Sequence, residues 1–539
     1  MPRTDLALAL FLAAVTALTR VPFRALLLPT WDAVQFALAL HEYDVVRHQP
    51  HPPGYILFVA LGRLVDVLAG DAAVSLTGLA LGAAAATVFL VYRLAWRLYG
   101  RATAVAASTV LAASPLFWFY GVVGLSYTTE AALATALAAA IWRLRDGRPR
   151  AALASALALG LAGGVRQSLL VLLLPLWVGM AWRHVPPGRR GRVVLGGLGA
   201  LGLATAAWLV PMVWLTGGVG RYVGAALELF DSTIRATTVL GEWRGNAVAL
   251  TEALVLGLGL LLPPAIVLAI AALRRLPRWD ARAWFFAGWV VPPLLVYTFF
   301  HFGQYGYLLT ILPALSILLG RGLVAGAGRL PAAVPRLPVI AALLGAVALG
   351  HVAFFTRAAS IEVPGLFAVP SGAEGWGTAL RARYRFRLWP HTARGLAEQE
   401  AVIRAYVDAV RREFAPDDTV LVTELGNARS YPWFRHVMYY LPEYPVYHLR
   451  LDPYSPGYLS SRYDGSMVSL GGPEVWLPAG TRRLAWVVDH WDPRIPRPPG
   501  LRERPLPYGR RLYVLDLERR AVAHGGYRLT PVTAVARLR

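Results

Sequence analysis

The sequence predicts a polytopic α-helical membrane protein with a C-terminal α/β domain outside the membrane. Of its 539 residues, 56% are hydrophobic and only 16% are charged, whereas a soluble domain carries roughly 25% charged residues. Apolar runs close to the length that crosses a bilayer, about 20 residues, recur up to residue 356. The remainder is rich in Pro, Arg, Tyr and Asp and has no such run. We therefore expect a membrane domain over 1–357 and an external α/β domain over 358–539.

Eleven runs are predicted to span the membrane. They are approximately 6–28, 72–97, 103–120, 127–145, 150–164, 168–183, 192–216, 247–273, 281–300, 305–320 and 336–356. The apolar stretch 54–70 is short and contains Arg63 and Asp66, so we place it at the interface. The choice follows the positive-inside rule, because it gathers the arginine-rich connections on one side. The predicted topology is that of a multi-pass cell-membrane protein with a cytoplasmic N-terminus and an external C-terminal domain.

Two external loops are expected, 29–71 and 217–246. In the first loop, residues 34–46 suit a short interfacial helix, a Pro-Pro-Gly turn follows, and a second interfacial helix can begin near Tyr55. The second loop mixes charged residues with Tyr, Phe and Trp. It is interpreted either as a lid or lipid-facing interfacial helix, or as a connector.

The C-terminal domain shows the alternation of strands and helices typical of an α/β fold. Apolar runs bounded by turn residues predict strands, and a helical period predicts helices. The expected strands are Thr419–Thr423, Val446–Leu449, Leu484–Val488 and Leu512–Leu515, and the expected helices are Glu398–Phe414 and Tyr431–Leu441.

Two acids fall on the predicted external face. Asp32 follows the first span and Glu130 opens the fourth. Each also has a structural explanation, because Asp32 could cap an interfacial helix and Glu130 suits the positive end of a helix dipole. Carboxylates near the membrane are costly unless they are used or paired, so both are candidates for a general base or a hydroxyl ligand.

Other candidates collect on the same face. Arg166, the one arginine in the short external connections, suits a phosphate ligand, although an interface anchor is the alternative. Gln167 adjoins it. A sugar or pyrophosphate pocket, or an aromatic belt, would explain the group His301, Gln304, Tyr305 and Tyr307. His48 and His51 have a spacing that is weak evidence for a metal site.

These motifs together resemble the GT-C superfamily of polyprenyl-phosphate-sugar-dependent glycosyltransferases, in particular its protein O-mannosyltransferase-like branch. The resemblance covers about residues 1–350. The motifs that carry it, in chain order, are Asp32, His51-Pro52-Pro53-Gly54-Tyr55, Arg93–Gly100, Ser114–Trp118, Thr129-Glu130 and Gln304–Tyr307. It implies a GT-C-like fold with Asp32 as catalytic base and Glu130 shaping the site. Relatives often carry two acids in the first motif, whereas this chain has Gln35 near the second position. No cofactor is assigned, and a divalent cation is left open.

The resemblance implies transfer of a hexose or pentose, with inversion, from a polyprenyl-phosphate donor to an acceptor hydroxyl on the external face. We take His51 and Tyr55 as substrate-binding, and Arg166 with Arg235 as phosphate ligands. The partners would be the lipid-linked sugar, membrane lipid, and a glycan, lipid or protein acceptor. The net charge of +22 is explained by topology and not by nucleic acid. The alternatives are a lipid or glycan flippase, and an inactive scaffold of an envelope polymer assembly system.

Overall fold

The structure is a computed structural model that describes residues 1–235, 238, 239, 241, 243–274, 279–301, 303–358, 362–363, 386–387, 391–425, 434–451, 461–465, 467–488, 491, 495–518 and 520–532. Helices dominate the first part of the chain. They are α1 (Arg3–Arg20), α2 (Trp31–His41), α3 (Ile56–Ala69), α4 (Ala72–Tyr99), α5 (Arg101–Ala113), α6 (Pro115–Tyr120), α7 (Tyr127–Trp142), α8 (Pro149–Ala162), α9 (Ser168–His184), α10 (Arg190–Leu215), α11 (Val219–Leu229), α12 (Arg244–Leu258), α13 (Leu262–Leu273), α14 (Ala281–Phe299), α15 (Leu312–Ala327) and α16 (Arg336–Arg357).

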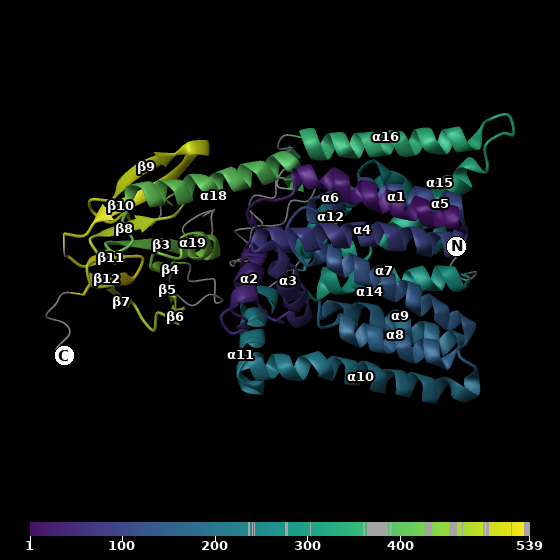
Figure 1. Cartoon of the computed structure of the whole chain (residues 1–539), viewed down its shortest axis with the longest axis horizontal. Coiled ribbons are helices and arrows are strands. Elements are labelled where there is room, and N and C mark those ends of the chain that lie inside the picture. The colour runs from purple at the N-terminus through teal and green to yellow at the C-terminus, as the bar shows by residue number, and fades with distance from the viewer. Residues whose placement is uncertain are drawn as a thin grey trace.

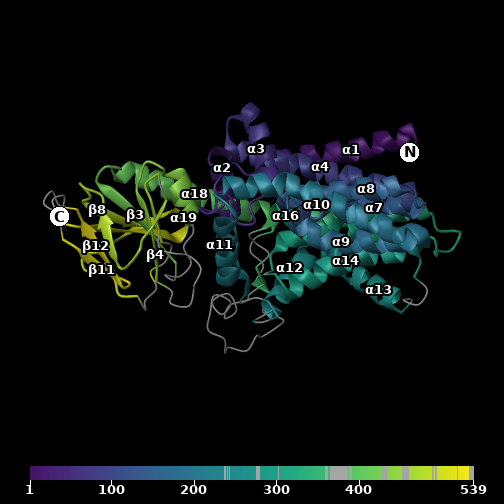
Figure 2. The ribbon, with the colours of Figure 1, turned by 90° about the horizontal axis from the view of Figure 1, so that it is seen from below.

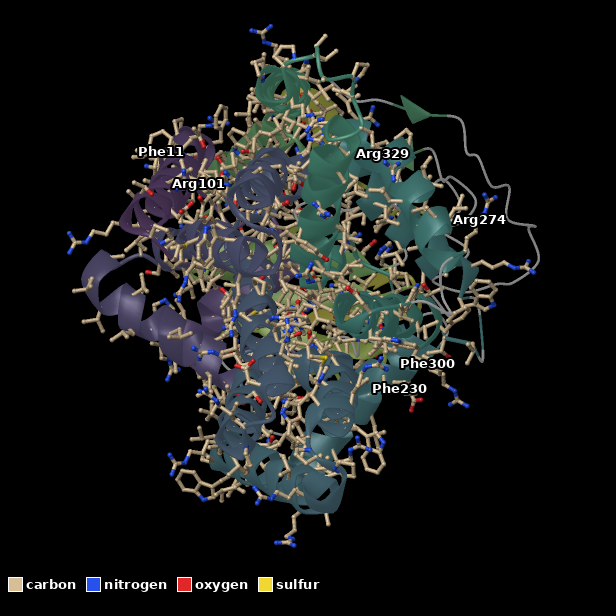
Figure 3. The ribbon with its side chains drawn as sticks, turned by 90° about the vertical axis from the view of Figure 1, so that its right-hand side faces the viewer. Phe11, Arg101, Phe230, Arg274, Phe300 and Arg329 are labelled. Carbon is tan, nitrogen blue, oxygen red and sulfur yellow. The ribbon has the colours of Figure 1, made fainter. Side chains whose placement is uncertain are left out.

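The long helices lie side by side in a bundle (Figure 1). Within the described residues, five helical stretches are long and apolar enough to cross a membrane, and shorter apolar helices such as α5, α8, α9 and α15 complete the bundle. Side chains such as Phe11 and Phe300 project from its outside and are 61% and 57% exposed (Figure 3). Such exposure of large apolar groups is expected where lipid replaces water. The count of eleven spans stays a prediction.

Three predicted spans are interrupted in the structure. The span 103–120 breaks into α5 and α6 at Pro115, whose ring is tolerated only in the first turn of a helix. The span 247–273 breaks between α12 and α13, where the ring of His351 accepts a hydrogen bond from the Leu260 N–H at 3.2 Å. The span 305–320 opens with a 3-10 segment, Tyr305–Thr310, before α15 begins. These breaks were not predicted, and the 3-10 segment contributes to the candidate site.

The first predicted loop forms two helices, α2 and α3, as expected. Figure 1 shows α2 running across the direction of the bundle helices, at the end next to the C-terminal domain. Arg63 of α3 donates to the carbonyls of Leu40 and Ala39, both at 2.9 Å, and Asp66 accepts from the Ser75 hydroxyl at 2.7 Å. The charges that argued against a spanning segment are therefore satisfied inside the loop and its neighbour α4.

The C-terminal domain is built on a seven-stranded mixed sheet of order β6-β5-β4-β3-β8-β10-β9. Central β3 pairs in parallel with β4 and β8, and the outer pairings are antiparallel. Its strands are β3 (Thr419–Leu425), β4 (Val446–Arg450), β5 (Ser461–Tyr463), β6 (Val468–Ser469), β8 (Arg483–Trp486), β9 (Arg502–Leu506) and β10 (Arg510–Asp516). A second sheet of order β11-β12-β7 contains β7 (Glu474–Leu477), β11 (Val522–His524) and β12 (Tyr527–Pro531), and β1 (Glu362–Val363) pairs with β2 (Phe386–Arg387).

Two apolar cores cover the two faces of the large sheet. One face packs against α18 (Ala393–Glu413) and α19 (Phe434–Tyr440), and the other packs against the small sheet. Figure 2 shows these helices on the side of the domain that meets the bundle. The domain is thus a three-layer structure whose helical layer reaches the membrane part of the chain.

The N-terminus and the C-terminal domain lie at opposite ends of the bundle (Figure 1). Figure 3 looks onto the N-terminal end, where Arg101, Arg274 and Arg329 are found. These arginines belong to the connections that the sequence places on the cytoplasmic side. The arrangement agrees with that grouping, while the orientation of the bundle in a membrane stays a prediction.

Candidate active site

Asp32 lies in the first turn of α2, at the end of the bundle that faces the C-terminal domain. The helix is capped by Thr30, whose hydroxyl accepts from the Ala33 N–H at 3.2 Å. The alternative that Asp32 is the cap therefore fails. Its carboxylate is 29% exposed, and the nearest charged partner recorded for it is His51, with Asp32 Oδ1 3.9 Å from His51 Nδ1. The positive end of the helix dipole favours an ionised carboxylate at this position.

A chain of polar contacts runs from His51 to both of its neighbours. His51 Nδ1 is 2.7 Å from Gln35 Oε1, and His51 Nε2 is 3.2 Å from the Tyr55 hydroxyl. Burial lowers the pKa of His51, and the negative charge of Asp32 partly opposes that shift. Burial raises the pKa of Tyr55 to about 12. A neutral imidazole that donates from Nδ1 to Gln35 and accepts from Tyr55 at Nε2 satisfies all these groups.

The Pro-Pro-Gly turn is fixed by side chains from three other elements. The carbonyl of Pro53 accepts from Gln167 Nε2 at 2.9 Å and from the Tyr222 hydroxyl at 3.2 Å. The Tyr43 hydroxyl donates to the carbonyl of Gly54 at 2.7 Å. Gly54 has φ +107, a backbone conformation that a residue with a side chain rarely adopts. Gln167 thus holds the turn that carries His51 and Tyr55, and α11 reaches the site through Tyr222.

Glu130 and Arg166 form a buried ion pair. Glu130 Oε2 lies 2.7 Å from Arg166 Nε, and the two residues are 0% and 6% exposed. Glu130 Oε1 accepts from the hydroxyls of Ser168 and Thr310, both at 3.0 Å. Arg166 Nη1 donates to the Ser126 hydroxyl at 2.7 Å. The helix-start and interface-anchor explanations therefore miss the main contact of both residues, which is with each other.

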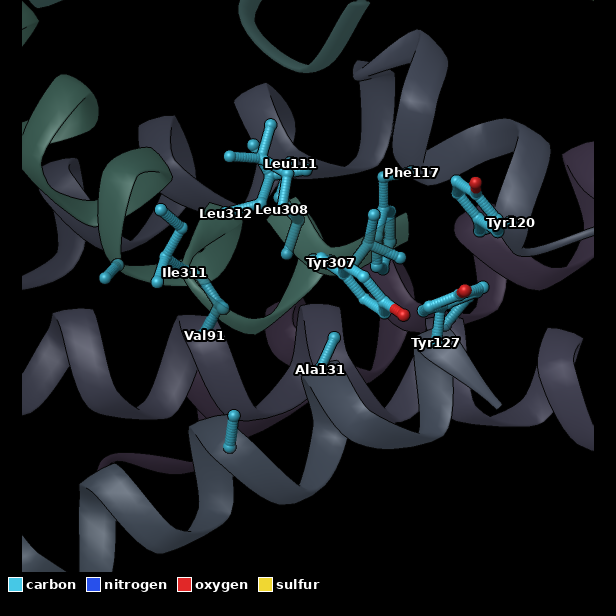
Figure 4. Packing of buried hydrophobic residues seen from close by; sticks show 14 of the residues in the cluster. Val91, Leu111, Phe117, Tyr120, Tyr127, Ala131, Tyr307, Leu308, Ile311 and Leu312 are labelled. Atoms are coloured by element: carbon cyan, nitrogen blue, oxygen red, sulfur yellow. The ribbon is translucent and has the colours of Figure 1, made fainter. Parts of the chain in front are cut away.

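Aromatic rings surround the Arg166 guanidinium. Its central carbon lies 4.4 Å from the ring centre of Tyr127, 5.3 Å from Tyr307 and 5.7 Å from Tyr55, within the range of cation–π attraction. Figure 4 shows Tyr127 and Tyr307 side by side, with Tyr120 close to Tyr127. The group therefore presents hydroxyls and ring faces together, as a sugar-binding surface requires.

The 3-10 segment supplies the remaining contacts of this wall. Tyr127 donates to Gln304, and Tyr307 stacks on Tyr297 with ring centres 4.4 Å apart. The ring of His301 meets Tyr307 edge-on at 5.1 Å. A side chain at Gly306 would collide with the ring of Tyr127, since an added Cβ would lie 2.6 Å from it. The close approach of segment and helix thus requires glycine here.

Comparison with known proteins bears on this arrangement. Residues 32–186 match the family model for the protein O-mannosyl-transferase TMEM260 N-terminal domain, a range that begins at Asp32 and includes Glu130 and Arg166. The crystal structure of ArnT from Cupriavidus metallidurans bound to undecaprenyl phosphate is similar in fold, with a TM-score of 0.50 and 14% identity over 83% of this chain and 86% of that chain. The chain carries a glycosyltransferase domain with the GT-C fold.

Two further solved structures are similar to the GT-C chain. Apo ArnT from Cupriavidus metallidurans has a TM-score of 0.49 and 14% identity, with 82% of this chain and 85% of that chain covered. The archaeal oligosaccharyltransferase AglB from Archaeoglobus fulgidus, in complex with an inhibitory peptide and a dolichol-phosphate, has a TM-score of 0.46 and 12% identity, with 89% and 69% covered. No curated protein matches the chain.

The candidate residues of the GT-C domain meet around Tyr55. The positive charge of Arg166 lowers the pKa of the Tyr55 hydroxyl, and the negative charges of Asp32 and Glu130 raise it. His51, Tyr307 and Gln304 join the same network through the contacts given above. Two candidates lie apart from it. Tyr305 donates to Glu252 of α12, and Arg235 is 64% exposed and paired with Asp231 at 3.4 Å.

The GT-C site also contains residues that were not singled out as ligands from the sequence. Gln35 was noted only as a departure from the family motif, yet its amide fixes His51. Tyr127 and Ser126 directly precede the Glu130 motif and gave no signal of their own. Glu252 is a carboxylate inside a predicted span, which is by itself a signal for function and was passed over. His391, a residue of the C-terminal part, packs its ring edge-on against Tyr305 at 4.4 Å.

The GT-C site was also examined for a divalent cation. In the part of the chain that the structure describes, no group of three or more His, Cys, Asp or Glu residues is arranged to hold a metal ion. At Asp32, the nitrogen of His51 that faces the carboxylate already contacts Gln35. The residues present therefore do not form a metal cage of the kind that a bound Mg²⁺ or Zn²⁺ requires.

Proposed function

We propose that the chain transfers a sugar from a polyprenyl-phosphate donor to an acceptor hydroxyl on the external face of the membrane, with Asp32 as general base. The carrying observation is the uncapped, partly exposed carboxylate at the start of α2, in a domain whose family match begins at this residue. ArnT, which shares the fold, binds undecaprenyl phosphate, and this supports the class of donor.

The proposed reaction is a single inverting displacement. Asp32 takes the proton of the acceptor hydroxyl, and the acceptor oxygen forms a bond to the anomeric carbon. The bond between that carbon and the phosphate oxygen breaks, and its electron pair stays on the phosphate. A general base of this kind contributes roughly 10²- to 10⁴-fold to the rate. The products are the glycosylated acceptor and the polyprenyl phosphate.

The neighbouring residues have supporting roles in this proposal. His51, held by Gln35 and Tyr55, orients the surroundings of Asp32. Arg166 supplies the positive charge that stabilises the phosphate leaving group, and its pairing with Glu130 fixes the guanidinium among the tyrosine rings. We assign no step to Arg235, because its contact lies with Asp231.

The flippase alternative places essential charges near the middle of the bilayer. The buried pair of this protein lies instead at the loop ends of its helices, with Glu130 in the first turn of α7 and Arg166 just before α9. This position favours chemistry at the membrane surface over passage of a solute through the bundle.

The proposal is tested with the purified chain in lipid nanodiscs. Polyprenyl-phosphate mannose and a peptide with Ser and Thr hydroxyls are the first probes, because the family model describes a protein O-mannosyl-transferase. We expect Asp32→Asn to lower single-turnover transfer by about 10²- to 10⁴-fold while binding of the donor is retained. Full turnover by this variant would rule out Asp32 as the base.

Glu42→Gln is the matched control. Glu42 belongs to the same loop, is 58% exposed at its side chain and pairs with Arg47 at the surface, so its loss should leave transfer unchanged. A second arm adds EDTA to the wild-type protein. Since no step is assigned to a metal, we expect an unchanged rate, and loss of transfer that Mg²⁺ or Mn²⁺ restores would contradict that assignment.

A further inference from the structure

The C-terminal domain holds three consecutive backbone amides just ahead of the proposed base. Glu400 Oε1 accepts from the N–H groups of Leu26 and Leu27 at 2.6 and 3.0 Å. The hydroxyl of Tyr440 accepts from the Leu28 N–H at 2.7 Å. A carboxylate that accepts two amide hydrogen bonds is among the stronger contacts in proteins. Only Pro29, Thr30 and Trp31 separate this segment from Asp32.

The same helix of the domain contacts the other side of the loop. Arg435, which is 3% exposed, donates from Nη2 to the carbonyl of Arg47 at 2.7 Å, and its guanidinium lies 6.0 Å from the ring centre of Trp31. His436 interacts with the backbone of Leu28 and Pro29, and burial lowers its pKa to about 3, so its ring is neutral at ordinary pH. The segment that carries Asp32 is therefore tied to the domain on both flanks.

The apolar cores of the two parts interlock around these contacts. Trp31 and Leu38 of α2 pack against the core of the C-terminal domain. In return, Leu396 belongs to the core of the bundle, and Tyr440 packs against that core. Figures 1 and 2 both show α19 at the face of the domain turned toward α2. The contact is a packed interface, and the hydrogen bonds to Leu26–Leu28 lie at its edge.

We propose that Glu400 and Tyr440 are positioning residues, through which the C-terminal domain holds the Asp32 segment in the geometry that transfer requires. The inference rests on the proposed function in that Asp32 is taken as the base. The segment between Leu28 and Asp32 is short, so displacement of its first residues moves the carboxylate relative to His51. A misplacement of about 1 Å in an active site can cost about 100-fold in rate.

The test uses the full chain in nanodiscs with three substitutions. Glu400→Ala removes the acceptor, Tyr440→Phe removes the hydroxyl, and Glu400→Gln restores a neutral acceptor oxygen at the same place. Glu398→Ala and Tyr439→Phe are matched controls. Glu398 lies on the same helix as Glu400 and pairs with Arg394 at the surface, and Tyr439 adjoins Tyr440 with its ring packed on the bundle.

Two measurements are made on each variant: kcat against donor KM, and hydrogen exchange of the peptide that contains Leu26–Leu28. We expect Glu400→Ala and Tyr440→Phe to lower kcat by about 10- to about 100-fold, with donor KM within about twofold and faster exchange of these amides. Glu400→Gln should recover most of the rate, and both controls should behave as wild type. A merely structural role would lower the thermal midpoint and the amount of folded protein without this split between kcat and KM.

The outcomes separate this inference from the proposed function. Unchanged exchange in Glu400→Ala and Tyr440→Phe would overturn the contact itself, whatever the activity. Faster exchange with wild-type kcat would overturn the positioning role while Asp32 remains the base. If Asp32→Asn keeps full turnover, the base assignment falls alone, and a lower kcat with faster exchange in Glu400→Ala would still support positioning of the loop.

Discussion

Loss of the negative charge of Glu130 should destabilise the protein strongly. In Glu130→Gln the Oε1 position can still accept from Ser168 and Thr310, but an amide NH₂ would face the guanidinium of Arg166, where Oε2 now lies 2.7 Å away. Both residues are almost completely buried, and an uncompensated buried charge costs about 3–5 kcal/mol. The expected shift in the unfolding equilibrium is therefore about 10²- to 5 × 10³-fold.

A double-mutant cycle with Arg166→Met isolates the pair. Each single variant leaves one charge buried alone, whereas the double variant leaves none, so its loss of stability should be smaller than the sum of the two. The measurement is the free energy of unfolding in detergent, combined with the transfer assay. Because Arg166 also lies among Tyr55, Tyr127 and Tyr307, we expect transfer to fall in both single variants.

Asp146→Asn is the matched control for this cycle. Asp146 forms an ion pair with Arg97 at 3.8 Å in which both side chains are about 40% exposed, and exposed pairs contribute roughly 0–1 kcal/mol. Additive losses in the Glu130 and Arg166 cycle, or a Glu130→Gln variant as stable as the control, would refute the reasoning.

Two further predictions concern the loop and the external domain. Thr30→Ala should cost about 0.5–2 kcal/mol, since it removes the cap of α2, and Thr30→Ser should restore the thermal midpoint; equal midpoints for the alanine and wild-type proteins would exclude the cap. Burial lowers the pKa of His436 and of His448 to about 3, so below pH about 6.5 the unfolded chain binds protons that the folded chain does not. Stability should therefore fall as the pH falls, by about 2 kcal/mol for each histidine at pH 5, and thermal melts of wild type, His436→Gln and His448→Gln between pH 7.5 and 5 would show a flatter profile in the variants. A wild-type midpoint that does not change over this range would contradict the assignment.

Local patterns in the sequence were sufficient for much of the fold. The Pro-Pro-Gly turn separated two short helices, and the arginine distribution kept 54–70 out of the count of spans, as the position of α3 now shows. In the external domain, the helical period over Glu398–Phe414 and four apolar runs correspond to α18, β3, β4, β8 and β10. All of these signals lie within a few turns or one strand of sequence, where the periodicity of apolar residues is decisive.

Contacts between distant residues could not be predicted in the same way. The sequence placed Glu130 and Arg166 on one face but gave no means of pairing them, because each has an adequate local explanation. The cap of α2 was ambiguous between Thr30 and Asp32, which are both good capping residues two positions apart. The break of the third span at Pro115 was readable in principle, since proline opens a helix and rarely continues one. The short edge strands of the domain carry too few residues for a recognisable alternation.

The interlocked cores have a consequence for how such proteins can diverge. Because Trp31 completes the core of the C-terminal domain and Leu396 that of the bundle, neither part can be exchanged for its counterpart in a relative without exposing apolar surface in both. A chimera that joins this bundle to a foreign domain must carry the loop around α2 together with α18 and α19. These two stretches, far apart in the chain, are expected to change together among relatives as one inherited unit.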